Sequence, residues 1–313
     1  MSESSLASEA TPIAPPAWTG PALLLAGGVC IGFAPIGLRL GLGEMGPFAI
    51  AFWRYVFALP ILFCLVLVAE RRLPVRPNRF LLVAGTCFAL DIALWHWGLS
   101  LTTVANATFI VNLGNIGVGL AAWLFLSQRP TRIWAIAAMI ALIGAAILSL
   151  GGEADGKTDL RGDLLALGAA VLVSGYMLAS SVARRTIGAL DAIFWLTAVE
   201  VVVGGLVVAV SPEVFMPERI EGFQAPLVLA VVVQVMGQGL IIAGLGRTAP
   251  AIAGVLVLVQ PVVAAAISWR LFDEPLTGLQ AGGALLILVG VFLAQRRATD
   301  KKASQIAVAS GID

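Results

Sequence analysis

The amino-acid sequence predicts an all-α polytopic membrane protein whose ten transmembrane helices form two inverted repeats of five helices each. Three observations support this fold class: an apolar composition, ten apolar segments long enough to cross a bilayer, and an internal duplication. Hydrophobic residues make up 59% of the 313 residues and charged residues only 12%, about half the charged share of an ordinary soluble domain. Because so little polar surface cannot cover a protein in water, lipid is the expected solvent along most of the chain.

The apolar segments each approach the roughly 20 residues that a helix needs to span the hydrocarbon core. They are expected to be helical, because a helix satisfies its own backbone hydrogen bonds where no water is present. The ten expected spans are Pro21–Leu40, Pro47–Ala69, Phe80–Leu99, Thr102–Leu126, Ile133–Leu150, Asp163–Ala183, Leu190–Val210, Gln224–Leu245, Ala249–Leu271 and Leu279–Ala294. Five of them fall in each half of the chain.

The duplication relates residues 98–144 to residues 244–290, without a gap, at a shift of 146 positions. Twelve of the forty-seven positions are identical, among them Trp123 with Trp269 and Gly144 with Gly290. A weaker repeat at a shift of 142 relates the second span to the seventh. Because five is an odd number, the second copy must cross the membrane in the opposite sense. Inverted repeats of this kind are common in transporters, which bind substrate near mid-membrane between the two halves.

The expected organisation is a disordered N-terminal tail at 1–20, a first repeat at 21–150, a periplasmic linker at 151–162, a second repeat at 163–295 and a cytoplasmic C-terminal tail at 296–313. Nine arginines in alternate loops and four basic residues of the C-terminal tail place thirteen positive charges on one side, against five on the other. The positive-inside rule therefore predicts a multi-pass protein of the inner (plasma) membrane with both termini in the cytoplasm.

Two helix connections at equivalent positions of the repeats carry related motifs, Leu-Ser-Gln-Arg-Pro-Thr at 126–131 and Phe-Asp-Glu-Pro-Leu-Thr at 272–277. With Gly-Pro-Phe-Ala-Ile-Ala-Phe-Trp-Arg at 46–54, they resemble the drug/metabolite transporter superfamily and its ten-helix EamA-type exporters. The chain departs from the family pattern at Gln128, where Glu is usual, and at Asn115, which stands opposite Pro261. The resemblance implies an exporter, and the polar and aromatic residues are similar to those of exporters of aromatic and other neutral amino acids.

Charged side chains inside a span are costly, on the order of 2.5–3.5 kcal/mol each, so they require a reason. Arg54 could bind a carboxylate with two hydrogen bonds, or it could extend to the membrane surface and bind backbone carbonyls. Asp91 and Glu200 are candidate coupling residues that could bind a proton or an amine, although a structural pair across a helix interface would also explain them.

The third span ends in Trp95-His96-Trp97, where Trp95 and His96 are candidate substrate-binding residues and a membrane-interface position is the alternative. On a helix, Asp91 and Trp95 share a stripe, whereas His96 points about 140° away from Asp91. The face with Asp91 and Trp95 and the face with His96 therefore cannot both point directly into one cavity.

Uncharged polar side chains complete the candidate binding site, since amides and hydroxyls suit a neutral or zwitterionic solute. Pro261 is expected to kink the ninth helix just after one of them. Helix–helix hydrogen bonding, worth about 0.6 kcal/mol per contact, is the structural alternative. These candidates are Asn112, with Thr108 and Asn115 on the same stripe, Tyr176, Gln234, Gln238 and Gln260.

The sequence lacks a Ser/His/Asp arrangement, a cluster of metal-ligand residues and a glycine-rich nucleotide loop, so no enzyme, cofactor or metal site is expected. It also lacks the basic runs of a nucleic-acid partner. The expected partners are the lipid bilayer and a small-molecule substrate, and a monomeric state is left open. The predicted function is export of small neutral or zwitterionic metabolites, amino acids including aromatic ones, by alternating access. The alternatives are a proton-coupled exporter of lipophilic drugs or cations and, more remotely, a membrane enzyme or scaffold subunit.

Overall fold

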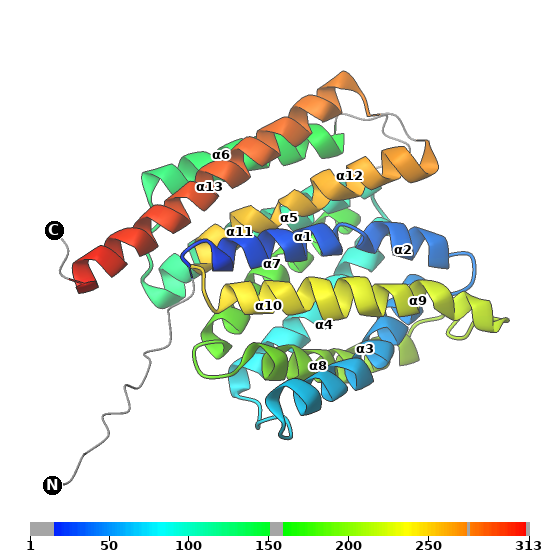
Figure 1. Ribbon diagram of the computed structural model, residues 1–313. Coiled ribbons are helices and arrows are strands. Elements are labelled where there is room, and N and C mark those ends of the chain that lie inside the picture. The colour runs from blue at the N-terminus through cyan, green and yellow to red at the C-terminus, as the bar shows by residue number, and fades with distance from the viewer. Residues whose placement is uncertain (1–15, 151–158, 274–275, 311–313) are drawn as a thin grey trace, which may run out of the picture.

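The computed structural model describes residues 16–150, 159–273 and 276–310. Ten helical spans in these residues are long enough and apolar enough to cross a membrane, and they lie side by side in one bundle (Figure 1). The fold class predicted from the sequence is confirmed.

The first five spans are made by α1 (Thr19–Ile31) with α2 (Ala34–Gly41), α3 (Pro47–Glu70), α4 (Arg79–Leu99), α5 (Val104–Leu126) and α6 (Arg132–Leu150). The second five are made by α7 (Leu160–Ala183), α8 (Ala189–Ala209), η1 (Ile220–Phe223) with α9 (Gln224–Leu229), η2 (Ala230–Gln238) and α10 (Gly239–Leu245), α11 (Pro250–Val257) with α12 (Val259–Phe272), and α13 (Gly278–Ser310). Where the structure describes the whole connection between two successive spans, that connection is short and the two spans run antiparallel.

The helix pair α6 and α13 shows the symmetry of the two repeats most directly, because each helix approaches the other's backbone at a glycine. A Cβ added at Gly144 of α6 would lie 2.6 Å from the carbonyl oxygen of Gly283, and one added at Gly290 of α13 would lie 2.7 Å from that of Ala137. Residues 137 and 283, like 144 and 290, are related by the shift of 146. The two contacts are thus copies of each other with the helices exchanged, which is the signature of a twofold relation.

The helix ends before α6 and α13 are also copies. Ser127 and Asp273 both adopt the left-handed conformation, with φ of 55° and 53°. Thr131 then accepts a hydrogen bond from the backbone N–H of Trp134 (3.2 Å), and Thr277 accepts one from Gln280 at the equivalent place (3.1 Å). The duplicated sequence therefore encodes a duplicated turn and N-cap.

Three spans are not continuous α-helices. The ninth breaks at Leu258, three residues before Pro261, as expected for a proline that cannot donate to the carbonyl of Val257. The break between α1 and α2 at residues 32–33 and the π-helix η2 in the eighth span were not expected from the sequence. The last helix also continues to Ser310, where the sequence predicts a tail from residue 296.

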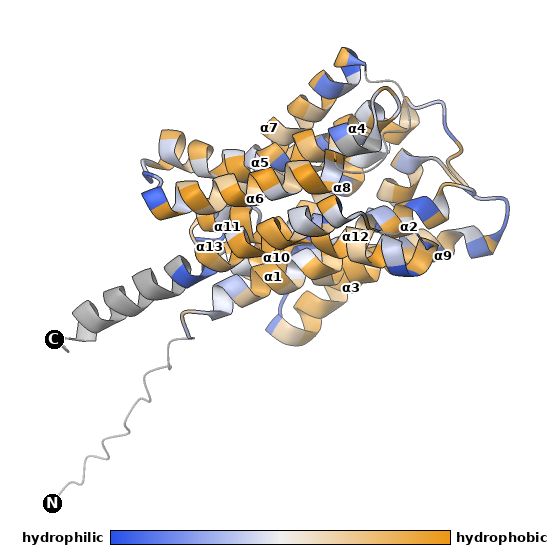
Figure 2. Ribbon diagram, turned by 90° about the horizontal axis from the view of Figure 1, so that it is seen from above, coloured by the Kyte–Doolittle hydropathy of each residue, from blue (hydrophilic) through white to orange (hydrophobic). Residues whose placement is uncertain are grey.

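Most helical residues of the bundle are apolar (Figure 2), and many of the large apolar side chains face outward. Large side chains such as Leu124, Val171 and Val68 are 76%, 67% and 77% exposed, which would be unfavourable in water but is suited to lipid. The buried residues form a hydrophobic core and also include strongly polar side chains of the spans such as Arg54, Asp91 and Glu200.

Candidate transport cavity

A cavity of about 200 Å³ lies in the middle of the bundle and is lined by residues of both repeats. Its walls come from the first, second, third and fourth spans of the first repeat and from the sixth, eighth and ninth spans of the second. Seven of the predicted site residues line it: Arg54, Asp91, Trp95, Asn112, Tyr176, Gln238 and Gln260.

Arg54 reaches the cavity from the N-terminal third of α3 and is only 6% exposed. Its Nη2 donates to the hydroxyl of Tyr55 (3.0 Å), whereas its Nε has no hydrogen-bond partner. Arg54 thus points into the bundle and not to the membrane surface, which removes the alternative of a surface-seeking side chain. Its guanidinium remains available for an acceptor group.

Asp91 and Trp95 lie one turn apart on α4 and both face the cavity. Asp91 is 4% exposed, and none of the described residues donates a hydrogen bond to its carboxylate. The indole Nε1 of Trp95 is buried without an acceptor. One face of α4 therefore carries an acceptor and a donor that have no hydrogen-bond partner among the described residues.

His96 is the one aromatic candidate on α4 that the structure does not bring to the cavity. It is 7% exposed, and its ring packs against Phe48 of α3 with centroids 5.9 Å apart. The angle of about 140° from Asp91 explains this position, because one helix face cannot hold both.

Polar side chains of α5 form a short chain of hydrogen bonds along the cavity wall. The amide of Asn112 donates to the carbonyl of Thr108 (2.9 Å), and the amide of Asn115 donates to Oδ1 of Asn112 (3.1 Å). All these bonds are within one helix. They hold the amides in place without joining α5 to a neighbour, as helix–helix hydrogen bonds would.

The lining residues that come from the second repeat carry no charge. The hydroxyl of Tyr176 on α7 donates to Oε1 of Gln238 (3.1 Å), which orients the amide so that its Nε2 is left without a partner. The Tyr176 ring also packs on Phe88 of α4, with centroids 4.9 Å apart. Gln260 lines the cavity beside Pro261 at the break of the ninth span.

Gln234 and Glu200 lie outside the lining of the cavity. Both are fully buried, and Gln234 donates from Nε2 to Glu200 (2.6 Å) and to the hydroxyl of Thr197 (2.9 Å). Gln234 and Gln238 are four positions apart, which places them on one side of the helix. They lie in the π-helix η2, where Gln234 bonds to Thr197 and Glu200 of α8 and Gln238 bonds to Tyr176 of α7.

The apolar part of the lining includes Phe88, Met177 and Pro35, which sequence reasoning did not single out. Phe88 precedes Asp91 by three residues and so shares its helix face, a signal that was present. Met177 and Pro35 resemble the many other apolar residues of the spans, and no local pattern separates them.

The cavity thus combines buried donors that lack acceptors with a carboxylate that lacks a donor. The donors are Arg54 Nε, Trp95 Nε1 and Gln238 Nε2, and the carboxylate is Asp91. Buried polar groups normally have partners, so this arrangement is suited to a small molecule that carries both an acceptor and a cationic or donor group. Among the residues described by the structure, no three His, Cys, Asp or Glu side chains gather where they could hold a metal ion.

Two inverted five-helix repeats with a polar cavity at their seam define the architecture of a secondary transporter. The EamA-like transporter family matches residues 18–150 and 160–295. The chain therefore belongs to this family, as the motifs of the two helix connections predict.

Two individual proteins illustrate the similarity. A stretch of 105 residues is 31% identical to the uncharacterized transporter YwfM of Bacillus subtilis (strain 168), covering 33% of this chain and 35% of that protein. The match thus spans about a third of the length of this relative. A crystal structure of another protein, 17% identical, superposes with a TM-score of 0.77 over 90% of this chain and 98% of its own. At this identity the likeness concerns the fold alone.

Proposed function

We propose that the protein exports small neutral or zwitterionic metabolites, and in particular amino acids including aromatic ones, by alternating access at the central cavity. One observation carries the proposal: Arg54 and Asp91, of opposite charge, line the same buried cavity and are not paired with each other by a salt bridge. A zwitterion offers a partner to each of them at once.

The unpartnered groups fit the two ends of an amino acid. Its carboxylate would accept hydrogen bonds from Arg54, Trp95 and Gln238, and its ammonium group would donate to Asp91. The rings of Phe88 and Tyr176 provide an apolar wall against which an aromatic side chain could pack.

The size and charge of the cavity favour a small zwitterion over a lipophilic drug. Its volume of about 200 Å³ is below the roughly 300–1,000 Å³ of sites for drug-sized ligands. A lipophilic cation would also leave Arg54 buried without an anionic partner, beside a second positive charge. The exporter of lipophilic cations is nevertheless a second candidate, because the Asp91 carboxylate faces the cavity; it predicts that amines lacking a carboxylate are the preferred ligands.

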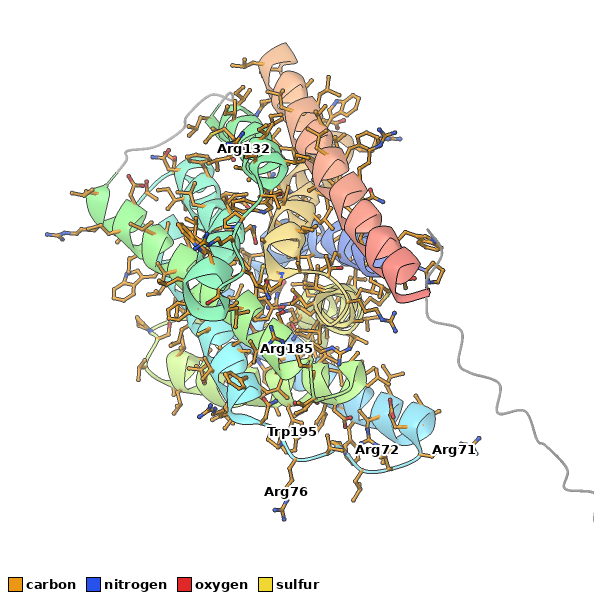
Figure 3. The ribbon with its side chains drawn as sticks, turned by 90° about the vertical axis from the view of Figure 1, so that its left-hand side faces the viewer. Arg71, Arg72, Arg76, Arg132, Arg185 and Trp195 are labelled. Carbon is orange, nitrogen blue, oxygen red and sulfur yellow. The ribbon has the colours of Figure 1, made fainter. Side chains whose placement is uncertain are left out.

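We further propose that the protein resides in the inner (plasma) membrane with both termini in the cytoplasm. The start of α1 and the end of α13 lie at the same end of the bundle (Figure 1). Figure 3 looks onto that end and shows Arg71, Arg72, Arg76, Arg132 and Arg185 there. This distribution supports a cytoplasmic end by the positive-inside rule. A reporter fused to either terminus should be active only inside the cell, and an external reporter signal from either would contradict this orientation.

Flux through the purified protein tests the function. Proteoliposomes preloaded with labelled phenylalanine, tryptophan, threonine or methionine should lose label faster than protein-free liposomes. Liposomes with the Arg54→Ala variant serve as the matched control and should approach the protein-free rate. If none of the four amino acids moves through the native protein, the substrate class proposed here is wrong.

A further inference from the structure

A second polar cluster lies beside the cavity, between α8 and the eighth span, and it is not needed to bind a substrate. Glu200 of α8 and Gln234 of η2 are both 0% exposed. Gln234 Nε2 donates to Oε2 of Glu200 (2.6 Å) and to Oγ1 of Thr197 (2.9 Å). Glu200 is therefore held in place while it remains outside the lining of the cavity.

This cluster has more acceptors than donors. Oε1 of Glu200 and Oε1 of Gln234 are both buried without a hydrogen-bond partner. Both atoms are acceptors when Glu200 is ionised, and the two N–H groups of the Gln234 amide are already used. A proton on Glu200 would supply an additional O–H donor within the cluster. An amide is a suitable neighbour for either state, because it can donate to a carboxylate or, after rotation, accept from a carboxylic acid.

The charges around Glu200 also favour a proton on its carboxyl group. Among the buried ionisable groups that the structure describes, Asp191 in the first turn of α8 is paired with Arg72 (2.6 Å). Arg54 is then the one positive group that interacts electrostatically with both Asp91 and Glu200. If both carboxyl groups were ionised, the interior of the bundle would hold an uncompensated negative charge, which is strongly unfavourable in a membrane.

Glu200 interacts electrostatically with Arg54 and Tyr55 on α3 and with Tyr176 on α7. The helix α4, which also packs against α8, carries the other titratable groups of this region, Cys87, Asp91 and His96. The helices α3 and α8 are in contact one turn away, where a Cβ added at Gly204 would lie 3.4 Å from the Tyr55 ring. Arg54 is the neighbour of Tyr55 and bonds to its hydroxyl. A charge on Glu200 can therefore act on Arg54.

We propose that Glu200 is a proton-binding site: it carries a proton while Asp91 is the carboxylate that faces the cavity, and loss of that proton draws Arg54 away from a bound carboxylate. Protonation forms one O–H bond on Glu200 with a proton taken from water. The ionised Glu200 and the carboxylate of a ligand would compete for the same guanidinium, so the proton and the ligand bind cooperatively. The proton on Glu200 is independent of which ligand fills the cavity, whereas its effect on affinity rests on the proposed function.

Infrared spectroscopy of the purified full-length protein tests the proton directly. At neutral pH the native protein should show the carbonyl stretch of a protonated carboxylic acid. This band should be lost in Glu200→Gln and kept in Asp191→Asn, which is the matched control because it removes a buried carboxylate of the same helix that is already paired with Arg72. In case a variant does not fold, native protein labelled with carboxyl-¹³C glutamate should show the band shifted. A band that is absent at neutral pH, or one that survives Glu200→Gln, would overturn the proposal.

The pH dependence of phenylalanine binding tests the consequence. One linked proton reduces affinity by up to about tenfold for each pH unit above the titration of Glu200. The native protein should therefore bind phenylalanine more weakly as pH rises, whereas Glu200→Gln should bind it equally at all these pH values. Equal pH dependence in both proteins would overturn the coupling between Glu200 and Arg54. If the native protein binds no phenylalanine at any pH, the proposed function fails, while the infrared band still decides whether Glu200 holds a proton.

Discussion

The fourth and ninth spans occupy equivalent places in the two repeats, yet they are built differently at the cavity. The helix α5 is continuous from Val104 to Leu126, whereas its counterpart is divided into α11 and α12 at Leu258. The shift of 146 places Leu258 opposite Asn112 and Pro261 opposite Asn115. Where one copy has two amides on an unbroken helix, the other has a proline and a break.

The same divergence separates charged from neutral positions. Arg54 and Asp91 belong to the first repeat, and their counterparts in the second are Leu196 at a shift of 142 and Gly237 at a shift of 146. The glycine contacts and N-caps, in contrast, are equivalent in both copies. The duplication thus maintains the packing of the bundle, while one half supplies the charges of the cavity and the other supplies its neutral wall and two irregular helices. Such a cavity can orient a zwitterion, which a symmetric one could not.

The largest effect is expected from removing the positive charge that Arg54 of the first repeat places in the cavity. Arg54→Ala should weaken phenylalanine binding by about 100-fold or more, because two charge-assisted hydrogen bonds of about 1.5–3 kcal/mol each are lost and each 1.4 kcal/mol is tenfold. Isothermal titration of the purified protein measures this, with Arg161→Ala, an exposed arginine on α7, as the control. An affinity within threefold of the native value would mean that Arg54 does not bind the ligand.

Proline substitutions at the equivalent positions 115 and 261 test why the ninth span is broken and the fourth span is not. Asn115→Pro should destabilise the protein by about 3 kcal/mol, because α5 would lose a hydrogen bond in its interior. Pro261→Ala should leave stability unchanged or improve it, since the ninth span already tolerates the break. Thermal unfolding in detergent compares the two variants. If they destabilise equally, the two spans are not as different as their structures indicate.

The symmetric glycine contacts should be equally sensitive in both repeats. Gly144→Ala and Gly290→Ala each place a Cβ within 2.6–2.7 Å of a backbone carbonyl and should cost about 1–3 kcal/mol. Gly282→Ala lies on the same helix α13 but meets nothing within 4 Å, so it should be neutral or stabilising by up to about 1 kcal/mol. If the unfolding midpoint falls in only one of the two glycine variants, the two contacts do not contribute equally to stability and the prediction is wrong.

The smallest effect concerns a contact that the second repeat does not reproduce. Trp134 of α6 donates from Nε1 to the carbonyl of Ala251 in α11 (2.7 Å), and its counterpart in α13 is Gln280. Trp134→Phe should cost about 1 kcal/mol through loss of this bond. The exposed Trp123→Phe is the control and should change the unfolding midpoint less. A larger loss in the control would show that the hydrogen bond contributes little.

The architecture could be predicted from sequence because lipid imposes simple rules. Span length, charge asymmetry and the duplication each depend on chemistry that is visible along the chain. The site was predictable only in part. Helical periodicity placed Asp91 and Trp95 on one face and His96 on another, as in the structure, but it does not reveal which neighbouring helix that face meets. It assigned Gln234 to the cavity because Gln234 shares a helix side with Gln238, and it gave no sign that Gln234 would bond to Glu200 and Thr197 of α8 instead.

The central claim, that one cavity recognises both ends of a zwitterion, is tested most directly by comparing three ligands of the same shape. Phenylalanine, phenethylamine without the carboxylate, and 3-phenylpropionate without the amine should be titrated against the purified protein. Phenylalanine should bind at least about tenfold more tightly than either analogue, because each analogue leaves Arg54 or Asp91 without its partner. Binding of phenethylamine as tight as that of phenylalanine would contradict the account and favour an exporter of cations.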